Sequence, residues 1–132
     1  MKFLLDTDIC IYLIKKKSPP VIEKLRACRA GDVGISAVTV AELRYGAAKS
    51  QRIQQNHEAL DLFLAPFEIV TLDENAAATY GEIRARREKT GHPIGPLDLL
   101  IAAHAKSLSV TLVTNNIGEF KRGKGLKVET WI

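Results

Sequence analysis

Short apolar runs recur along the chain, and each is bounded by polar or turn-forming residues. Runs of this length without polar alternation are typical of strands that are buried on both faces of a parallel sheet. The strands we expect on this basis are Lys2–Leu5, Val33–Ile35, Glu68–Leu72, Val110–Val113 and Leu126–Trp131.

Between these runs, apolar residues recur at intervals of three or four positions, as they do on the buried face of a helix. Asp73 is a good N-cap for one such helix, and Gly91 is typical of the position just beyond its end. The expected helices are Ile9–Lys16, Val21–Arg29, a segment from Ser36 or Thr39 to about Ala48, Gln54–Leu64, Asn75–Thr90 and Pro96–Leu108.

This alternation of strands and helices predicts an α/β fold. Its central sheet would have four to five mainly parallel strands, with helices on both faces. The chain contains no internal repeat, low-complexity tract or linker, and its 132 residues are the usual length of one domain. We therefore expect a single domain that spans residues 1–132.

The composition is that of an ordinary globular protein, with 46% hydrophobic and 26% charged residues. Nineteen Lys and Arg against fifteen Asp and Glu leave a net charge of +4, which permits a polyanionic partner without requiring one. No apolar run approaches the roughly 18 residues of a membrane span, and Asp6 and Asp8 interrupt the region where a signal peptide is uncharged. We expect a cytoplasmic protein that does not bind membranes, with Cys10 and Cys28 as free thiols.

Acidic and amide side chains stand at the points where the predicted strands meet helices. In parallel sheets, ligands bind beyond the carboxyl ends of the strands. The residues concerned are Asp6 and Asp8 after the first strand, Glu42 after the second, Asp98 at the start of the helix before the fourth, and Asn115, Asn116 and Glu119 after the fourth.

Each of these residues also has a purely structural interpretation. Asp6 or Asp8 could simply N-cap a helix. Thr39 and Glu42 match the capping-box pattern, and Asp98 would complement the macrodipole at a helix start. Glu119 could be a solvated loop charge.

Taken together, the acidic residues favour a metal site. Glu42 and Asp98 lie in otherwise apolar segments, so we expect them to be partly buried and close together. Two carboxylates about 4 Å apart repel by roughly 1–4 kcal/mol, and a divalent cation between them reverses the sign. Oxygen ligands without Cys or His pairs favour Mg²⁺ or Mn²⁺ over Zn²⁺, and the natural substrate of such a site is a phosphate.

Four segments carry a resemblance to a known family: LLDTDICIYLIK, ISAVTVAELRYGA, GHPIGPLDLLIAAHA and LVTNNIGEF. In this order they resemble the PIN-domain family and, within it, the VapC toxins of bacterial VapBC toxin–antitoxin pairs. The resemblance runs from Phe3 to Trp131. No single segment is decisive, but four in the right order are specific.

The family's site residues carry over to this chain by position. Thr7 and Thr114 match the hydroxyl residues that flank the site and are expected beside the substrate. Asp8 stands where such toxins commonly have Asn or Ser, and Asn116 is the neutral variant of its position, so the number of metal ions stays open. The resemblance implies a catalytic and metal-binding set of Asp6, Glu42, Asp98 and Asn116, with Glu119 as a further acidic neighbour.

The resemblance also implies an activity. It is that of an Mg²⁺-dependent endoribonuclease, with Mn²⁺ as a substitute, which hydrolyses structured RNA by a metal-activated water and is held inactive by a cognate VapB-like antitoxin. A homodimer is implied, with DNA contacted only through the antitoxin. The last two segments resemble enteric toxins that cleave initiator tRNA in its anticodon region, which favours tRNA as substrate and inhibition of translation as the outcome.

Affinity for RNA would come from basic side chains that contact phosphates, although each basic cluster could equally be a solvated face. Tyr45 or Tyr12 could stack on a base, but we expect both to pack within the fold. The histidines show no metal-ligand pairing and are expected to be structural. The substrate contacts we expect are Arg84, Arg87 and Lys121, with Arg86, Lys89, Arg122 and Lys124 as further candidates.

Two other functions fit parts of the pattern. A phosphoacceptor receiver domain is also α/β and could use Asp73 after a central strand, but Thr114-Asn115-Asn116 stands where its lysine belongs. A non-catalytic, RNA- or protein-binding relative would keep the fold without the reaction. The intact Asp6, Glu42 and Asp98 favour the enzyme over that relative.

Overall fold

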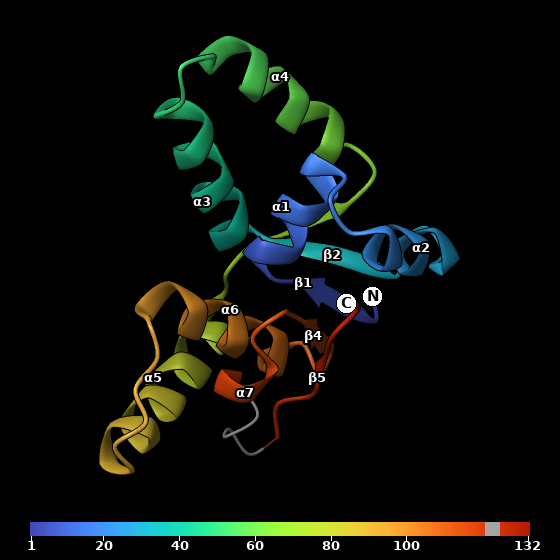
Figure 1. Cartoon of the computed structure of the whole chain (residues 1–132). Helices are drawn as coiled ribbons and strands as arrows, with labels where there is room; N and C mark the ends of the chain where they lie inside the picture. The colour runs from blue at the N-terminus through green and yellow to red at the C-terminus, as the bar shows by residue number, and fades with distance from the viewer. Residues whose placement is uncertain (121–124) are drawn as a thin grey trace.

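The computed structural model of the chain describes residues 1–120 and 125–132. Within these residues, five strands form one sheet in the order β3-β2-β1-β4-β5, and every neighbouring pair is parallel (Figure 1). This confirms the parallel sheet predicted from the apolar runs. The strands are β1 (Phe3–Leu5), β2 (Val33–Ser36), β3 (Glu68–Val70), β4 (Thr111–Val113) and β5 (Val128–Glu129).

Six helices lie where the apolar spacing predicts them. The helix after β2 begins directly after Ser36, the earlier of the two starts considered, whereas β5 is much shorter than the expected Leu126–Trp131. In the described ranges no helix is long and apolar enough to cross a membrane. The helices are α1 (Thr7–Lys15), α2 (Pro19–Ala27), α3 (Ala37–Ala48), α4 (Ile53–Leu64), α5 (Glu74–Lys89), α6 (Pro96–Ser107) and the short, unpredicted α7 (Ile117–Phe120).

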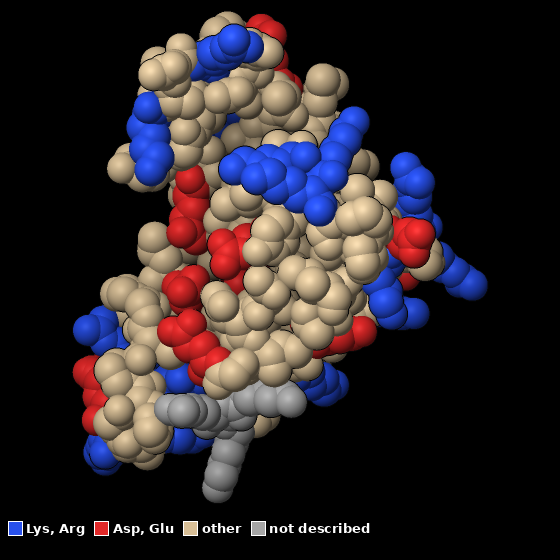
Figure 2. All heavy atoms as spheres, viewed as in Figure 1, with Lys and Arg blue, Asp and Glu red and all other residues tan. Residues whose placement is uncertain are grey.

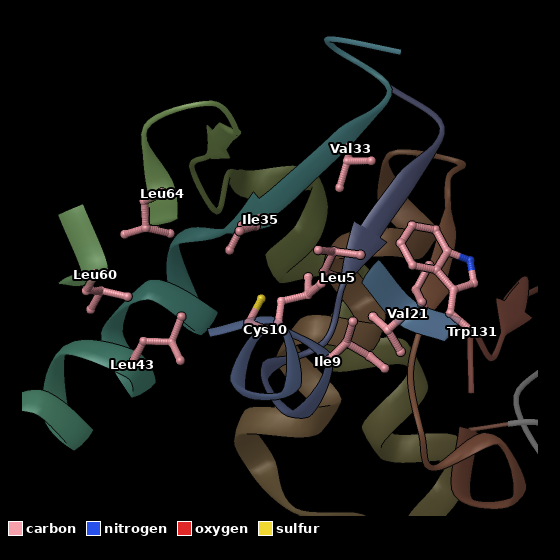
Figure 3. Close-up of a cluster of buried hydrophobic side chains, with 12 residues drawn as sticks. Leu5, Ile9, Cys10, Val21, Val33, Ile35, Leu43, Leu60, Leu64 and Trp131 are labelled. Carbon is pink, nitrogen blue, oxygen red and sulfur yellow. The ribbon is translucent and has the colours of Figure 1, made fainter. Parts of the chain in front are cut away.

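The helices cover both faces of the sheet, as expected. Successive side chains of a strand point to opposite faces. Leu5 therefore packs with α1 to α4 on one face, where Ile9 and Cys10 of α1 join it (Figure 3). Leu4, its neighbour, packs on the other face with Ile101 of α6.

The two cysteines are free thiols, as the sequence predicts. Cys10 lies buried in the cluster of Figure 3, and Cys28 is partly exposed. The pKa of each thiol is raised, chiefly by burial. Since the thiolate is the reactive form, neither residue is activated as a nucleophile.

The strand order places a topological switch point beside β1. The chain runs from β1 to β2 and β3 on one side, and then returns to β4 on the other side of β1. In open α/β sheets, ligands bind in the crevice outside the carboxyl ends of the strands at such a point. A ligand is therefore expected at the ends of β1 and β4, which are followed by Asp6 and Thr114.

Candidate active site

Asp6 lies at the switch point and is 2% exposed. Its backbone N–H donates to the Val113 carbonyl at 2.9 Å, which ties the end of β1 to β4. Its carboxylate accepts from the Thr7 N–H at 2.6 Å and from the Thr114 hydroxyl at 2.6 Å. Asp6 is thus the N-cap of α1, as its structural interpretation predicts, and also the innermost carboxylate of the site.

The Asp6 carboxylate is costly to ionise where it lies. Burial, the largest cause, raises the pKa of Asp6 from 3.8 to about 6. The hydrogen bonds from Thr114 and Thr7 lower it, while the negative charges of Asp98 and Asp8 raise it further. Among residues 1–120 and 125–132, no basic side chain is among the groups that shift the pKa of Asp6, so its carboxylate is suited to binding a cation.

Asp98 stands in the first turn of α6, where it is half-buried. Burial raises the pKa of Asp98, and so do the negative charges of Glu119, Glu42 and Asp8, in that order. The Asp98 carboxylate is thus repelled by acidic residues of α7, α3 and α1. The fold thus brings five carboxylates within electrostatic reach of one another, from the start of α1 and from α3, α6 and α7.

Glu42 reaches the cluster from α3. Its Oε1 accepts a 2.8 Å hydrogen bond from the Thr7 hydroxyl, which also lies 3.3 Å from the Thr39 hydroxyl. The N-cap of α3 is Ser36, and Thr39 lies inside the helix, so the capping-box interpretation of Thr39 and Glu42 is wrong. Glu42 is turned to another helix instead of to its own N-terminus.

On the molecular surface, acidic side chains run in a column down the middle of one face (Figure 2). The column crosses the region where Figure 1 shows α1, α3, α6 and α7. Asp8 and Glu119 are exposed, Glu42 and Asp98 are half-buried, and Asp6 is buried. The column therefore leads from solvent to the switch point.

The donors of this cluster fit a divalent cation. Neighbouring negative charges raise the pKa of Asp6 and that of Asp98, so a cation among these carboxylates would relieve the repulsion. Among the described residues, no three or more His, Cys, Asp or Glu stand in a ready-made ligand set. Carboxylate oxygens are the ligands that Mg²⁺ and Mn²⁺ prefer, and Mg²⁺ usually keeps several waters beside one or two protein carboxylates.

The hydroxyl and amide residues of the site act on other protein groups. Thr7 donates to Glu42, and Thr114 donates to Asp6 while accepting from the Asn116 N–H at 3.0 Å. Asn116 is exposed just before α7. The two threonines, expected beside the substrate, are thus placed to orient carboxylates.

The basic candidates separate in the structure. Arg84 is exposed on α5, where it bonds Tyr80 and Glu88. Arg87, by contrast, is 6% exposed and donates to the backbone carbonyls of Glu119 at 3.1 Å and Phe120 at 3.4 Å. Its guanidinium anchors α7 to α5, so Arg87 does not face solvent as a phosphate contact would. Lys121, with Arg122 and Lys124, lies outside the described residues.

The receiver-domain alternative does not fit this geometry. Its phosphoacceptor should follow a central strand, but Asp73 follows β3, which lies at the edge of the sheet. Asp73 instead N-caps α5 by accepting from the Ala76 N–H at 3.0 Å.

A buried hydrogen bond joins α3 and α6, two of the helices that carry acidic residues. Ser36 Oγ caps α3 by accepting from the Val38 N–H at 3.1 Å, and it lies 2.8 Å from Nδ1 of His104 on α6. Burial lowers the pKa of His104, so the ring is neutral and Nδ1 can accept from the Ser36 hydroxyl. His104 is structural, as expected, and sequence analysis gives no sign of its partner.

We expect Ser36→Ala to destabilise the protein by about 2–4 kcal/mol, since it removes a helix cap and leaves a buried ring nitrogen without its partner. Urea unfolding measures the change. Ser18→Ala is the matched control, because Ser18 occupies the N-cap of α2 without a side-chain cap hydrogen bond. Equal losses in the two variants would contradict a bridging role for Ser36.

A groove of about 480 Å³ opens beside the acidic column, between α1, α3 and α4. Glu42 and Thr7 line it on the acidic side. The rest of its lining is largely apolar and includes Ile11, Ile14, Leu43 and Leu60. The groove thus joins an apolar surface to the carboxylates.

The sequence matches the PIN domain family over residues 3–126. The tRNA(fMet)-specific endonuclease VapC of Shigella flexneri is 43% identical over 131 residues, which cover 99% of this chain and 98% of that relative. Ribonuclease VapC2 of Rickettsia felis is 42% identical over 132 residues, with the same shares covered.

Solved structures agree with these matches over the whole chain. The DNA-bound VapBC of Salmonella typhimurium has a TM-score of 0.95 at 39% identity, covering 100% of this chain and 99% of that chain. VapBC2 from Rickettsia felis, bound to a promoter DNA fragment, has a TM-score of 0.93 at 42% identity and covers 100% of both chains. The fold, the acidic cluster and these matches together show that the chain belongs to the PIN-domain family, in its VapC branch.

Proposed function

We propose that this chain is an Mg²⁺-dependent endoribonuclease, the toxin of a toxin–antitoxin pair. The observation that carries the proposal is the convergence of Asp6, Glu42 and Asp98, from three separate elements, on the switch point of the sheet. PIN nucleases are generally dependent on divalent metals, and Mn²⁺ is expected to substitute for Mg²⁺ here. The similarity to relatives named as ribonucleases supports the activity.

Some residues of the proposed site would bind the ion, and others orient the residues that bind it. Asp6, Asp98 and Glu42 would bind the ion, with Asn116 and Glu119 contributing at the rim. A bound ion supplies a water of lowered pKa and polarises the scissile phosphate. Thr114 and the Thr7 backbone fix both oxygens of the Asp6 carboxylate. Attack of water on phosphorus breaks the P–O3′ bond and leaves 5′-phosphate and 3′-hydroxyl ends.

We propose tRNA as the substrate, and initiator tRNA as the favoured species. The support is the 43% identity to a relative whose name specifies tRNA(fMet). Since tRNA is a cytoplasmic molecule, the cytoplasm is the proposed site of action, and inhibition of translation the outcome.

We propose a VapB-like antitoxin as the partner of this chain. Three of the solved neighbours are VapBC complexes, two of them bound to DNA. The apolar groove shares Glu42 with the acidic column, so an antitoxin segment lying in it would also block the site. The toxin is expected to be a homodimer that reaches DNA only through the antitoxin.

Cleavage of total RNA by the purified, antitoxin-free protein tests this proposal. We expect a discrete tRNA product in the presence of Mg²⁺, with a 5′-phosphate at the mapped cut. Uniform degradation, or cuts confined to messenger RNA, would contradict the tRNA substrate. Binding of RNA without any cleavage would favour the non-catalytic alternative.

A further inference from the structure

One exposed strip of α3 is left without a role by the acidic cluster and the apolar groove. Tyr45 and Lys49 lie three and seven positions beyond Glu42, which places all three on one side of the helix. The α3 residues that line the groove are Glu42, Leu43, Gly46 and Ala47, and Ser50 lines it just beyond the helix. Glu42 therefore lies between the groove and the exposed strip formed by Tyr45 and Lys49.

Tyr45 does not pack within the fold, contrary to our expectation from the sequence. It is 65% exposed, whereas Tyr12 is half-buried against the core and accepts from the Asn115 amide at 3.2 Å. The Lys49 ammonium lies 4.8 Å from the centroid of the Tyr45 ring. Because the exposure is measured with Lys49 in place, the ring still offers surface to a ligand.

We propose that Tyr45 and Lys49 form a subsite for the RNA substrate, in which a nucleobase stacks on the Tyr45 ring and Lys49 contacts a neighbouring phosphate. The subsite rests on the proposed ribonuclease function and adds a residue that binds the nucleotide beside the cut. Tyr45 is displaced from Glu42 by about 4.5 Å along the helix axis, at 1.5 Å per residue. The acidic column repels RNA, so a nearby aromatic and cation are needed to hold the strand.

The chemistry of both side chains suits a nucleic acid. Every base has a π-face, so stacking on an aromatic ring tolerates many sequences. Unpaired bases in RNA loops are recognised in this way, with cationic side chains on the backbone. A ring already oriented by an ammonium group lies ready for a base and its phosphate.

Binding of unfractionated tRNA to Asp98→Asn protein, which should not cut it, tests the subsite. In this background we expect Tyr45→Ala to weaken binding about 10-fold or more, in line with alanine substitutions of stacking residues. Tyr45→Phe should retain the affinity, and Tyr45→Leu should not. Lys49→Ala should reduce the slope of log affinity against log salt by about 0.7, as for one contact to a single strand.

Leu62→Ala is the matched control, because Leu62 is a large apolar residue on α4 that is 78% exposed and lies in neither strip. It should leave tRNA binding unchanged.

Equal binding by Tyr45→Ala and Tyr45→Phe would overturn the subsite. So would a change in oligomeric state on Tyr45→Ala without a change in tRNA affinity, since Tyr45 would then be a contact between copies. Wild-type cleavage that no Tyr45 variant alters removes the subsite alone, whereas wild-type protein that neither binds nor cuts RNA removes the proposed function with it.

Discussion

Asp98→Asn is expected to abolish RNA cleavage while leaving the fold and the affinity for RNA intact. Asp98 is the carboxylate that senses Glu119, Glu42 and Asp8 together, so it lies at the centre of the cluster. In the proposed metal site, removing its charge would remove a ligand of the ion. Loss of an outer-shell partner alone costs about 10–100-fold in metal affinity or activity, and we expect loss of this ligand to exceed about 100-fold.

The measurement is the initial rate of tRNA cleavage at saturating Mg²⁺, alongside tRNA affinity and circular dichroism. Glu88→Gln is the matched control, since Glu88 is an exposed acid on α5 that bonds Arg84. It should cut at the wild-type rate. Retention of cleavage by Asp98→Asn would mean that the metal site lies elsewhere.

Asp6→Asn is expected to make the metal-free protein more stable and inactive at once. Asp6 is nearly fully buried, and its raised pKa corresponds to a penalty of about 3 kcal/mol when the carboxylate is ionised. Asparagine can still cap α1, but it gives up the hydrogen bond that the Thr114 hydroxyl donates, at a cost of about 1 kcal/mol. The net gain is about 2 kcal/mol at neutral pH.

The gain depends on pH in a defined direction. Below the unfolded pKa of Asp6, both states are protonated and no penalty arises. Between pH 3.8 and about 6, the unfolded chain has lost a proton that the folded state still holds, so wild-type stability falls across this range and levels off above it. Asp6→Asn lacks this fall. Urea unfolding in EDTA should therefore show an advantage of the variant at pH 8 that shrinks at pH 5, and a variant less stable than wild type at pH 8 would contradict the account.

Addition of Mg²⁺ should reverse the order of stability. An ion that binds only the folded state stabilises it by about 1.4 kcal/mol for each tenfold excess over its dissociation constant. Wild-type protein should therefore gain unfolding temperature as Mg²⁺ is added, and Asp6→Asn should gain little. On this prediction, the Asp6 carboxylate lowers the stability of the metal-free protein and would raise it once an ion is bound, as is common for functional residues.

The sheet and the site are predictable from the sequence for a shared reason. Short apolar runs mark strands buried on both faces, and the residues directly after them must lie at the carboxyl edge of the sheet. Asp6 is placed by that rule alone, whereas Thr114 is expected only from the family resemblance. Asp98 is placed by the helix that Pro96 begins, whose continuous apolar middle must cover the sheet.

What the sequence does not show depends on contacts between distant segments. The α7 turn is only four residues long, and part of its support comes from the buried Arg87, 32 positions away from Glu119. The residue type alone does not distinguish the buried Arg87 from Arg84, which is exposed on the same helix. The pairing of Ser36 with His104 spans 68 positions and is equally invisible.

The exposure of Tyr45 is not expected from the sequence. Its neighbours on α3 include buried residues, so an aromatic at this position reads as part of the core. The ring nevertheless lies in solvent, because the buried residues Leu43 and Ala47 are two positions away on either side and face the opposite side of the helix.

The central claim is that the acidic cluster cuts RNA only with a divalent ion, and add-back of metal tests it most directly. Antitoxin-free protein would be freed of metal with EDTA, and tRNA cleavage measured before and after an excess of Mg²⁺ or Mn²⁺. We predict no cleavage in EDTA and recovery of the same discrete product with either ion. Undiminished cleavage in EDTA would contradict the account, since the carboxylates would then have no ion to hold.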